Sequence, residues 1–373
     1  MTDTKIDWQR IREEFPVTDS YTYLNTASSG AIAKQTATAI TDFYTDQLHH
    51  AAIHRNEWLQ VISSARKRAA DLLNSSADQI GFVGDVSSAM NYVADKISPK
   101  KQIILIRGDF PSVNIPWVMR GFTIRWVDQE PDHSISIDKI EKAIDEGGGV
   151  VAISWVQYSS GFTIDLKALS DICRKSGTLL VVDGTQGVGA IPIDLQSDRV
   201  DVLIASSFKW QGAGYGICLY YERPDADFDS PVKLTGWNSL HRFSGEMNRD
   251  NLRTNASAIE AGHAKYASLV ALNSGLQLMQ QIGWENIYQR NEHLREYLIH
   301  RLRKAGVVFH SPVEKNHIST ILCIKAQDEL YDYFEKNLVK VTKREDYIRL
   351  SVHYYNSESD IDRAIELIVN YQD

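Results

Sequence analysis

Short, continuously apolar runs separated by segments of helical periodicity are the feature that most restricts the fold of this chain. Between about residue 80 and residue 220, seven such runs are bounded mostly by Gly, Asp or Ser: QIGFVG, QIILIRG, FTIRWVD, VVAISWV, TLLVVDG, VDVLIAS and GICLYYE. The intervening LKALSDICRKSG spaces its apolar residues at i, i+3 and i+4, which is typical of an amphipathic helix. Apolar strands that alternate with such helices predict an α/β fold, in which a mostly parallel sheet is covered on both faces.

The pattern changes after about residue 220, which predicts a second, smaller domain. Helical patterns cover roughly 259–281 and 285–304, and the tail holds strand-like VVFHSP, STILCIKA and YIRLSVHYY before a closing helix, SDIDRAIELIVNY. We therefore expect a large domain over residues 18–256 and a small C-terminal α+β domain over 257–373. Residues 1–17 are expected to form an N-terminal segment that packs near the small domain.

Charge and composition exclude several classes of partner. The net charge is 40 − 48 = −8, so no basic field favours nucleic acid or an anionic membrane. The three cysteines are far apart, which argues against a disulfide scaffold or a zinc knuckle. The first residues, MTDTKIDWQRIREEF, lack the apolar segment of a secretory signal, and no run approaches the roughly 18 apolar residues of a membrane span. We expect a cytoplasmic protein.

The residues richest in chemistry follow two predicted strands. Asp183 ends the run VVD, and Lys209 follows VLIASSF. In parallel α/β sheets ligands gather beyond the carboxyl ends of the strands, so both side chains are predicted to face one ligand. Taken singly, a loop lysine is usually a solvated charge and Asp-Gly is a common turn. Together they suggest pyridoxal 5'-phosphate (PLP), with the lysine forming the Schiff base and the aspartate keeping the pyridine nitrogen protonated.

Several segments in a fixed order resemble the class-V aminotransferase family of fold-type-I PLP enzymes, whose relatives include cysteine desulfurases and isopenicillin N epimerase. The resemblance runs from YLNTASSGAI, residues 23–32, almost to the carboxyl terminus. It implies PLP fold type I: a large domain with a mostly parallel, mixed sheet flanked by helices, plus a smaller α+β domain. It also implies a homodimer with the active site near the interface.

The resemblance assigns roles to particular residues. Lys209 in SSFKWQGAGYG would carry the cofactor, and Asp183 in VVDGTQ would pair with the pyridine nitrogen. The other residues implied to contact the cofactor or the substrate are Ser87 and Ser88 at the phosphate, Ser206 also at the phosphate, Phe110 stacked on the ring, Gln186 at the phenolic oxygen, His263 from across the dimer interface, Tyr158 in place of a frequent asparagine, and Arg349 at the substrate α-carboxylate. A helix amino-terminus suits the phosphate because its free N–H groups attract an anion. A guanidinium suits the carboxylate because it can donate two parallel hydrogen bonds.

Departures from the family pattern guide the expected reaction. Cysteine desulfurases carry a cysteine shortly before the carboxylate-binding arginine, and VKVTKREDYIR contains none. We therefore expect that the protein is not a cysteine desulfurase. We expect amino-group transfer at the α-carbon of an amino acid, with a carbon–sulfur β-lyase acting on a cysteine derivative as the alternative. An epimerase is a further alternative, although Phe110 offers no second base for it.

Rival interpretations have weaker support. The run G-T-Q-G-V-G at 184–189 lacks the spacing of a nicotinamide dinucleotide fingerprint. A PLP-fold protein used only for binding would be favoured if the lysine or the aspartate were missing, and both are present. His49, His50 and His54 include an i, i+4 pair but no H-E-x-x-H pattern, so we expect a solvated helix face and no metal site.

Overall fold

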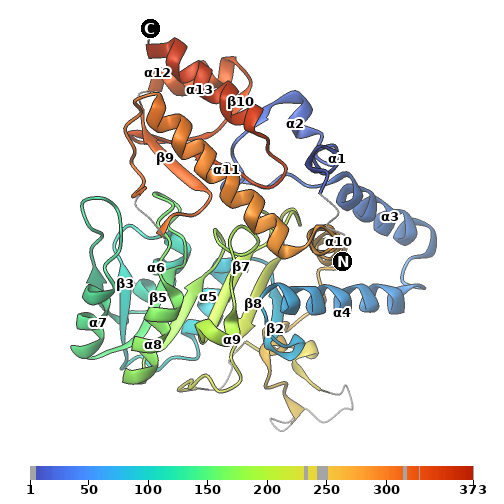
Figure 1. The fold of residues 1–373 in the computed structure, drawn as a ribbon. Helices are drawn as coiled ribbons and strands as arrows, with labels where there is room; N and C mark the ends of the chain where they lie inside the picture. The colour runs from blue at the N-terminus through green and yellow to red at the C-terminus, as the bar shows by residue number, and fades with distance from the viewer. Residues whose placement is uncertain (1–5, 231–233, 242–250, 314–316, 327, 373) are drawn as a thin grey trace, which may run out of the picture.

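The computed structural model describes residues 6–230, 234–241, 251–313, 317–326 and 328–372. The secondary structure over these residues follows the predicted alternation of strands and helices through the first two thirds of the chain (Figure 1). No helix within the described ranges is both long enough and apolar enough to cross a membrane.

A seven-stranded mixed sheet forms the centre of the larger part. Its spatial order is β2-β8-β7-β6-β5-β3-β4; β8 runs antiparallel to both its neighbours, and the other pairs are parallel. The strands are β2 (Ile80–Val83), β3 (Gln102–Ile106), β4 (Thr123–Val127), β5 (Gly148–Ser154), β6 (Leu179–Asp183), β7 (Val202–Ser206) and β8 (Cys218–Glu222). The predicted α/β fold with a mostly parallel sheet is confirmed.

Both faces of this sheet are buried, which explains why its strands read as unbroken apolar runs. In β6, Leu180 and Val182 belong to one apolar cluster, whereas Leu179 and Val181 belong to another. Successive residues of a strand point to opposite faces, so each face needs its own cover. The helices that follow the strands through this part are α5 (Val86–Ala94), α6 (Pro111–Met119), α7 (Ile137–Asp145), α8 (Leu166–Ser176) and α9 (Leu195–Asp198).

The C-terminal part is built on a three-stranded antiparallel sheet of order β11-β12-β9. Its elements are β9 (Ile321–Lys325), α12 (Asp328–Lys336), β10 (Val339–Lys340), β11 (Thr342–Arg344), β12 (Tyr347–Ser351) and α13 (Glu358–Gln372). The helices α10 (Tyr266–Ile282) and α11 (Trp284–Lys304) lead into it. The predicted strand VVFHSP is reduced to one isolated bridge, between Phe309 and Ile324.

Helix α10 begins seven residues later than the sequence pattern indicates. Glu260 lies in the segment expected to be helical, but its carboxylate accepts the Phe82 backbone N–H at 3.0 Å and pairs with Arg66 at 2.7 Å. These tertiary contacts tie residue 260 to β2 and α4 (Arg55–Leu72). The short 3₁₀ turns are η1 (Ala77–Gln79), η2 (Trp237–Ser239) and η4 (Ala256–Ile259).

The N-terminal residues lie against the C-terminal part of the chain. Arg12 donates to both carboxylate oxygens of Asp360, at 2.5 and 2.9 Å, and β1 pairs in parallel with β10. Figure 1 shows these blue N-terminal elements beside the red C-terminal ones. The elements are α1 (Trp8–Arg12), α2 (Val17–Ser20), β1 (Thr22–Tyr23) and α3 (Lys34–His50). The domain division at residues 256 and 257 stays a prediction.

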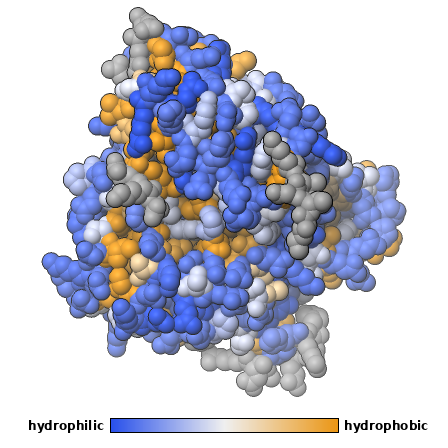
Figure 2. All heavy atoms as spheres, viewed as in Figure 1, coloured by the Kyte–Doolittle hydropathy of each residue, from blue (hydrophilic) through white to orange (hydrophobic). Residues whose placement is uncertain are grey.

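The outer surface is largely polar on the face shown in Figure 2, with apolar side chains gathered across its middle and left side.

Candidate active site

Three neighbouring strands end in polar residues that meet at one edge of the large sheet. Ser154 ends β5, Asp183 ends β6 and Ser206 ends β7, with Lys209 three residues further on. Parallel strands present their carboxyl ends at a common edge, so these side chains converge. The cavity there has a volume of about 200 Å³. It is lined by Asp85, Val86, Ser87, Phe110, Ser112, Ser154, Val156, Tyr158, Asp183, Thr185, Gln186, Ser206, Phe208 and Lys209.

Lys209 is the basic group of this cavity. Burial lowers the pKa of its amine to about 8, Asp183 opposes that shift, and the positive charges of Arg349 and Arg344 add to it. A lower pKa raises the share of neutral amine, which is the form that attacks a carbonyl carbon. Lys209 is therefore suited to act as a nucleophile and then as a base.

Asp183 is buried and receives a hydrogen bond from the Thr185 backbone N–H at 2.9 Å. Burial raises the pKa of its carboxyl group, with the Thr185 hydrogen bonds and the Lys209 charge opposing the shift. Thr185 also accepts the backbone N–H of Ser206 at 3.0 Å, which joins the ends of β6 and β7. A buried carboxylate needs a cationic or hydrogen-bonding partner, so this position suits a protonated ring nitrogen.

Asp109 is a second buried carboxylate that the sequence analysis missed. It accepts the Ser154 hydroxyl at 2.6 Å, the Ser154 N–H at 2.8 Å and the Phe110 N–H at 2.6 Å. It thereby fixes the end of β5 to the first residue before α6. Its signal was available, because GDF follows the apolar run QIILIR just as DG follows LLVV.

Phe110 and Tyr158 form one wall of the cavity. Their rings meet edge to face with centroids 5.3 Å apart, and the Lys209 Nζ lies 6.0 Å from the Phe110 ring centroid.

Gln186 is fixed at both polar atoms of its side chain: the amide nitrogen donates to the Ala27 carbonyl at 2.9 Å, and the amide oxygen accepts from the Trp210 indole at 3.0 Å. Its second amide N–H makes no hydrogen bond within the described part of the chain and remains a donor for a ligand.

The turn that enters α5 has one serine in the cavity and one outside it. Ser87 lines the cavity and exchanges a hydrogen bond with Ser112 at 2.8 Å. Ser88 is not in the lining; its N–H and hydroxyl both bind the carboxylate of Asp85, at 2.7 and 3.0 Å. Asp85 is thus the N-cap of α5. The predicted backbone contact of Ser88 with the phosphate is therefore occupied by Asp85 in this structure.

Arg349 lies on β12, and its side chain is almost fully buried. It donates to the Tyr158 carbonyl at 2.9 Å and to the Ser28 hydroxyl at 2.6 Å. Its Nε has no partner, and no carboxylate within the described part of the chain pairs with it. Burial lowers the pKa of this guanidinium. An unpaired buried cation is costly unless an anion joins it.

His263 lies apart from this cavity. It lines a separate pocket with Gly84, Glu260 and Lys265, and its ring contacts Trp237 with centroids 4.8 Å apart. Gly84 immediately precedes the N-cap of α5, so the two pockets lie on neighbouring segments. The structure of one chain does not bring His263 to its own Lys209.

All three cysteines are buried and none lines the cavity. Burial raises the pKa of Cys173 and of Cys323 to about 12, and raises that of Cys218 as well. Thiols of this kind are poor nucleophiles at neutral pH.

The donor set of the cavity fits PLP. The buried carboxylate at the end of β6 suits the ring nitrogen, and the lysine, whose lowered pKa leaves more of the neutral amine, suits the aldehyde. Ser87 and Ser206 offer hydroxyl groups to a phosphate beside a helix amino-terminus. These groups line one cavity.

Comparisons with known proteins agree with this chemistry. Residues 22–340 match the family model Aminotransferase class-V. A Bacillus subtilis protein named "Uncharacterized aminotransferase YcbU" is 26% identical, covering 96% of this chain and 97% of the relative. A "Probable cysteine desulfurase" of Streptomyces coelicolor is 24% identical, covering 80% of this chain and 76% of the relative.

Solved structures show the same fold. A cysteine desulfurase from Thermococcus onnurineus superposes with a TM-score of 0.87 at 18% identity, covering 100% of this chain and 99% of that one. A complex of the cystine C-S lyase C-DES with cysteine persulfide gives 0.86 at 20% identity, covering 95% and 99% of the two chains.

The predicted reaction needs correction. Amino transfer was the main expectation, and cysteine desulfurases were excluded because no cysteine precedes Arg349. Several relatives over most of the chain are named cysteine desulfurases, which contradicts that exclusion. The absence of one loop cysteine was too narrow a criterion, because it excludes only transfer of the sulfur to that cysteine and not cleavage of the carbon–sulfur bond itself. The alternative, carbon–sulfur cleavage, is better supported than amino transfer.

The family model spans well over half of the chain. The protein is therefore a PLP-dependent enzyme, and the chain belongs to the aminotransferase class-V family.

Proposed function

We propose that the protein is a carbon–sulfur lyase that cleaves the Cβ–S bond of cysteine or a cysteine derivative. PLP, when bound, withdraws electrons from the substrate Cα and so eases loss of the Cα proton and of the Cβ substituent. The relatives named cysteine desulfurase and the cystine C-S lyase of the same fold support sulfur as that substituent.

The observation that carries the amino-acid part of the proposal is the buried, unpaired guanidinium of Arg349. It is held in place by the Tyr158 carbonyl and the Ser28 hydroxyl, both of which leave its positive charge uncompensated. A substrate carboxylate would supply the missing negative charge and would accept hydrogen bonds from the guanidinium. Arg349 would thereby hold the substrate with its Cα facing the cavity.

The remaining groups divide the work at the reacting atoms. Lys209 would accept the Cα proton, because its lowered pKa leaves a useful fraction of free amine at neutral pH. Asp183 would keep the ring nitrogen protonated from its buried position at the end of β6. Phe110 would stack on the ring and, having no ionisable group, would leave proton transfer to Lys209.

The state of the three cysteines bears on which molecule carries the sulfur away after the Cβ–S bond is cleaved. Each thiol is buried with a raised pKa, so none offers a thiolate to the cavity. We propose that the carbon skeleton is released as pyruvate and ammonia, and that the sulfur leaves as sulfide from cysteine, as a thiol from an S-substituted cysteine, or as cysteine persulfide from cystine.

The direct test is to incubate the PLP-loaded protein with cysteine, cystine and S-substituted cysteines. Pyruvate, ammonia, alanine and released sulfur are then assayed separately, with Lys209→Ala as the inactive control. Release of sulfur in step with pyruvate or alanine supports Cβ–S cleavage, and pyruvate with ammonia identifies elimination. Stoichiometric conversion to a pyridoxamine form that needs a keto acid to turn over, without sulfur release, contradicts the proposal.

Replacing Arg349 by methionine separates its role in binding from any role in folding. We expect kcat/KM to fall roughly 30- to 1000-fold, because the substrate carboxylate loses a desolvated charged partner. This corresponds to a loss of about 2–4 kcal/mol in transition-state stabilisation. We expect the urea midpoint to stay the same or rise, because an uncompensated buried charge is removed. A large loss of stability with unchanged kinetics would show that Arg349 is structural.

We also propose that two copies form a dimer in which His263 reaches the phosphate site of the partner. His263 is exposed in a pocket lined by Gly84, whereas the next residue, Asp85, lines its own chain's active-site cavity. Light scattering should give twice the 42.2 kDa chain mass, and His263→Ala should weaken PLP retention. A monomer with full PLP affinity would contradict this.

A further inference from the structure

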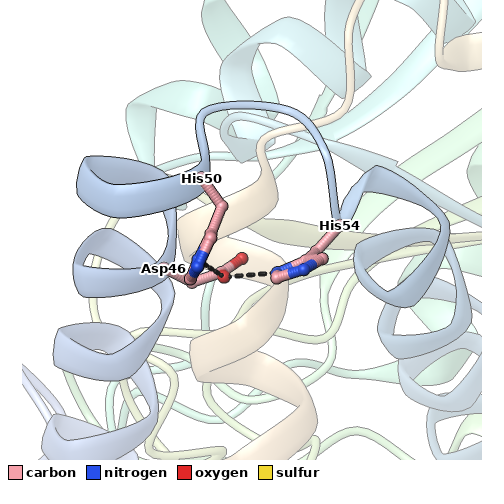
Figure 3. A group of neighbouring side chains, drawn as sticks. All are labelled: Asp46, His50 and His54. Atoms are coloured by element: carbon pink, nitrogen blue, oxygen red, sulfur yellow. Dashed lines mark hydrogen bonds and ion pairs between the residues drawn. The ribbon is translucent and has the colours of Figure 1, made fainter.

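Three side chains with metal-binding atoms converge where α3 ends and α4 begins. The Nδ1 atoms of His50 and His54 lie 2.9 and 2.6 Å from the same carboxylate oxygen of Asp46 (Figure 3). One potential ligand atom from each residue lies within 4.8 Å of the other two. Within the described ranges of the chain, these are the only three His, Cys, Asp or Glu side chains whose potential ligand atoms lie this close to one another.

The Asp46 carboxylate is held in this orientation from behind. Its other oxygen accepts the indole N–H of Trp58 at 3.1 Å. Trp58 is itself buried and packs edge to face on Phe43, with ring centroids 5.1 Å apart. Hydrogen-bonded outer groups of this kind fix the direction of a ligating carboxylate.

The two histidines come from opposite sides of a short connection. His50 is the last residue of α3, and His54 directly precedes α4, with Ala51 in a positive-φ conformation between them. Figure 3 shows both rings turned inward toward Asp46 across this loop. Asp46 lies one helical turn before His50, so the i, i+4 spacing puts these two side chains on the same face of α3. The loop then brings His54 back to the same place, so that three potential ligands face one another.

The geometry can accept a tetrahedral ion with a small movement. Zinc binds imidazole nitrogen and carboxylate oxygen at about 2.0–2.2 Å, so ligand atoms around it stand roughly 3.3 Å apart. The two nitrogen–oxygen contacts need only open by about half an ångström to reach that separation. The histidine side chains are partly exposed, which leaves them room to do so.

We propose that Asp46, His50 and His54 bind a Zn²⁺ ion, with water in the fourth position, and that this ion links α3 to α4. Two imidazoles with one carboxylate favour Zn²⁺ over Mg²⁺ or Ca²⁺, which prefer oxygen ligands. None of the three residues lines the active-site cavity. The ion would therefore stabilise the helical pair without taking part in the reaction.

The neighbouring His49 provides a matched control. It is exposed on the same turn of α3, and its only described contact is a ring contact with His50 at 6.3 Å. The three buried cysteines are not available as competing ligands. Binding of Zn²⁺ should thus depend on Asp46, His50 and His54 and not on His49.

Titration calorimetry of the PLP-loaded protein with ZnCl₂, without amino acid, tests the proposal. We expect one Zn²⁺ per chain with micromolar affinity, no comparable heat with MgCl₂, and unchanged binding in His49→Ala. In Asp46→Ala and in the double variant His50→Ala/His54→Ala, affinity should fall by about 10- to 100-fold or more.

A thermal melt gives a readout that does not depend on activity. Zn²⁺ should raise the melting temperature of the wild type and of His49→Ala by roughly 1–3 °C, because it binds only the folded chain, and should leave the double variant unmoved. Equal Zn²⁺ binding by the wild type and a folded double variant overturns the proposal. No heat and no melting shift in the wild type at millimolar Zn²⁺ overturns it as well.

Discussion

At Lys209, burial and neighbouring charges act in opposite directions on a single amine. Removal from water disfavours the charged form, and Arg349 and Arg344 disfavour it further, whereas Asp183 favours it. The net result is a pKa of about 8 in place of the ordinary 10.5. At pH 7 this leaves about one amine in ten neutral, compared with a few in ten thousand for an ordinary lysine.

This pKa predicts how the cofactor-free protein takes up PLP. The protonated amine cannot attack an aldehyde, so the rate of covalent attachment should rise with pH and level off above about pH 8. Arg344→Ala removes a charge that lowers the pKa, so its midpoint should move to higher pH. Stopped-flow absorbance across a pH series measures both midpoints. A wild-type midpoint near 10.5 would contradict the assigned environment.

At the scale of elements, the cavity depends on close contact between segments that are distant in sequence. Gly30 lies after β1, and its backbone N–H donates to the Phe208 carbonyl at 2.9 Å. A methyl group at Gly30 would come within 1.7 Å of the Lys209 carbonyl oxygen. This close approach explains why a residue without a side chain occupies the position.

Gly30→Ala should therefore displace the segment that carries Lys209. We expect a loss of about 1–3 kcal/mol in stability and weaker PLP binding, because the new methyl group meets backbone that cannot rotate away. Urea unfolding and PLP titration measure the two effects. For the stability measurement, Gly262→Ala is the matched control, since nothing in its own chain lies within 4 Å of its added methyl group. Equal urea midpoints of the two variants would show that the backbone contact at Gly30 has no role in stability.

At the scale of the whole molecule, the two ends of the described chain are joined. The Arg12–Asp360 pair is bidentate and mostly shielded from solvent, and Phe15 packs against Tyr355 with the two rings tilted and their centroids 4.7 Å apart. Asp360 also accepts the Ser357 backbone N–H at the start of α13. The N-terminal segment thereby braces the part of the chain that carries Arg349.

Arg12→Ala should lower the stability of the whole molecule by about 2–3 kcal/mol, because it leaves the Asp360 carboxylate shielded but without its cation. The control is Lys167→Ala in the exposed Lys167–Asp171 pair, for which we expect a change under about 0.5 kcal/mol. The shift in the urea midpoint measures both. Similar shifts for the two variants would contradict a bracing role for Arg12.

Local sequence was sufficient for the strands of the large sheet and for the meeting of Asp183 and Lys209 at its edge. A short, continuously apolar run bounded by turn residues favours a buried strand, so β6 and β7 follow from their own residues. Asp109 could have been found by the same argument, because it also follows an apolar strand.

Other parts of the site depend on contacts between distant segments. Arg349 lies in an alternating strand that alone favours exposure, and it is buried because β12 packs against residues near Ser28 and Tyr158. The start of α10 was decided by the pairing of Glu260 with Arg66, and the Asp46–His50–His54 cluster by the fold of one loop. The sequence by itself determined the strands of the large sheet and the residues at its carboxyl edge, because hydrophobic periodicity and strand ends are local properties, and its ordered motifs carried the resemblance that implied the family and the cofactor. Only the tertiary structure decided which charges are left unpaired, because burial and the position of a partner depend on the packing of the whole chain.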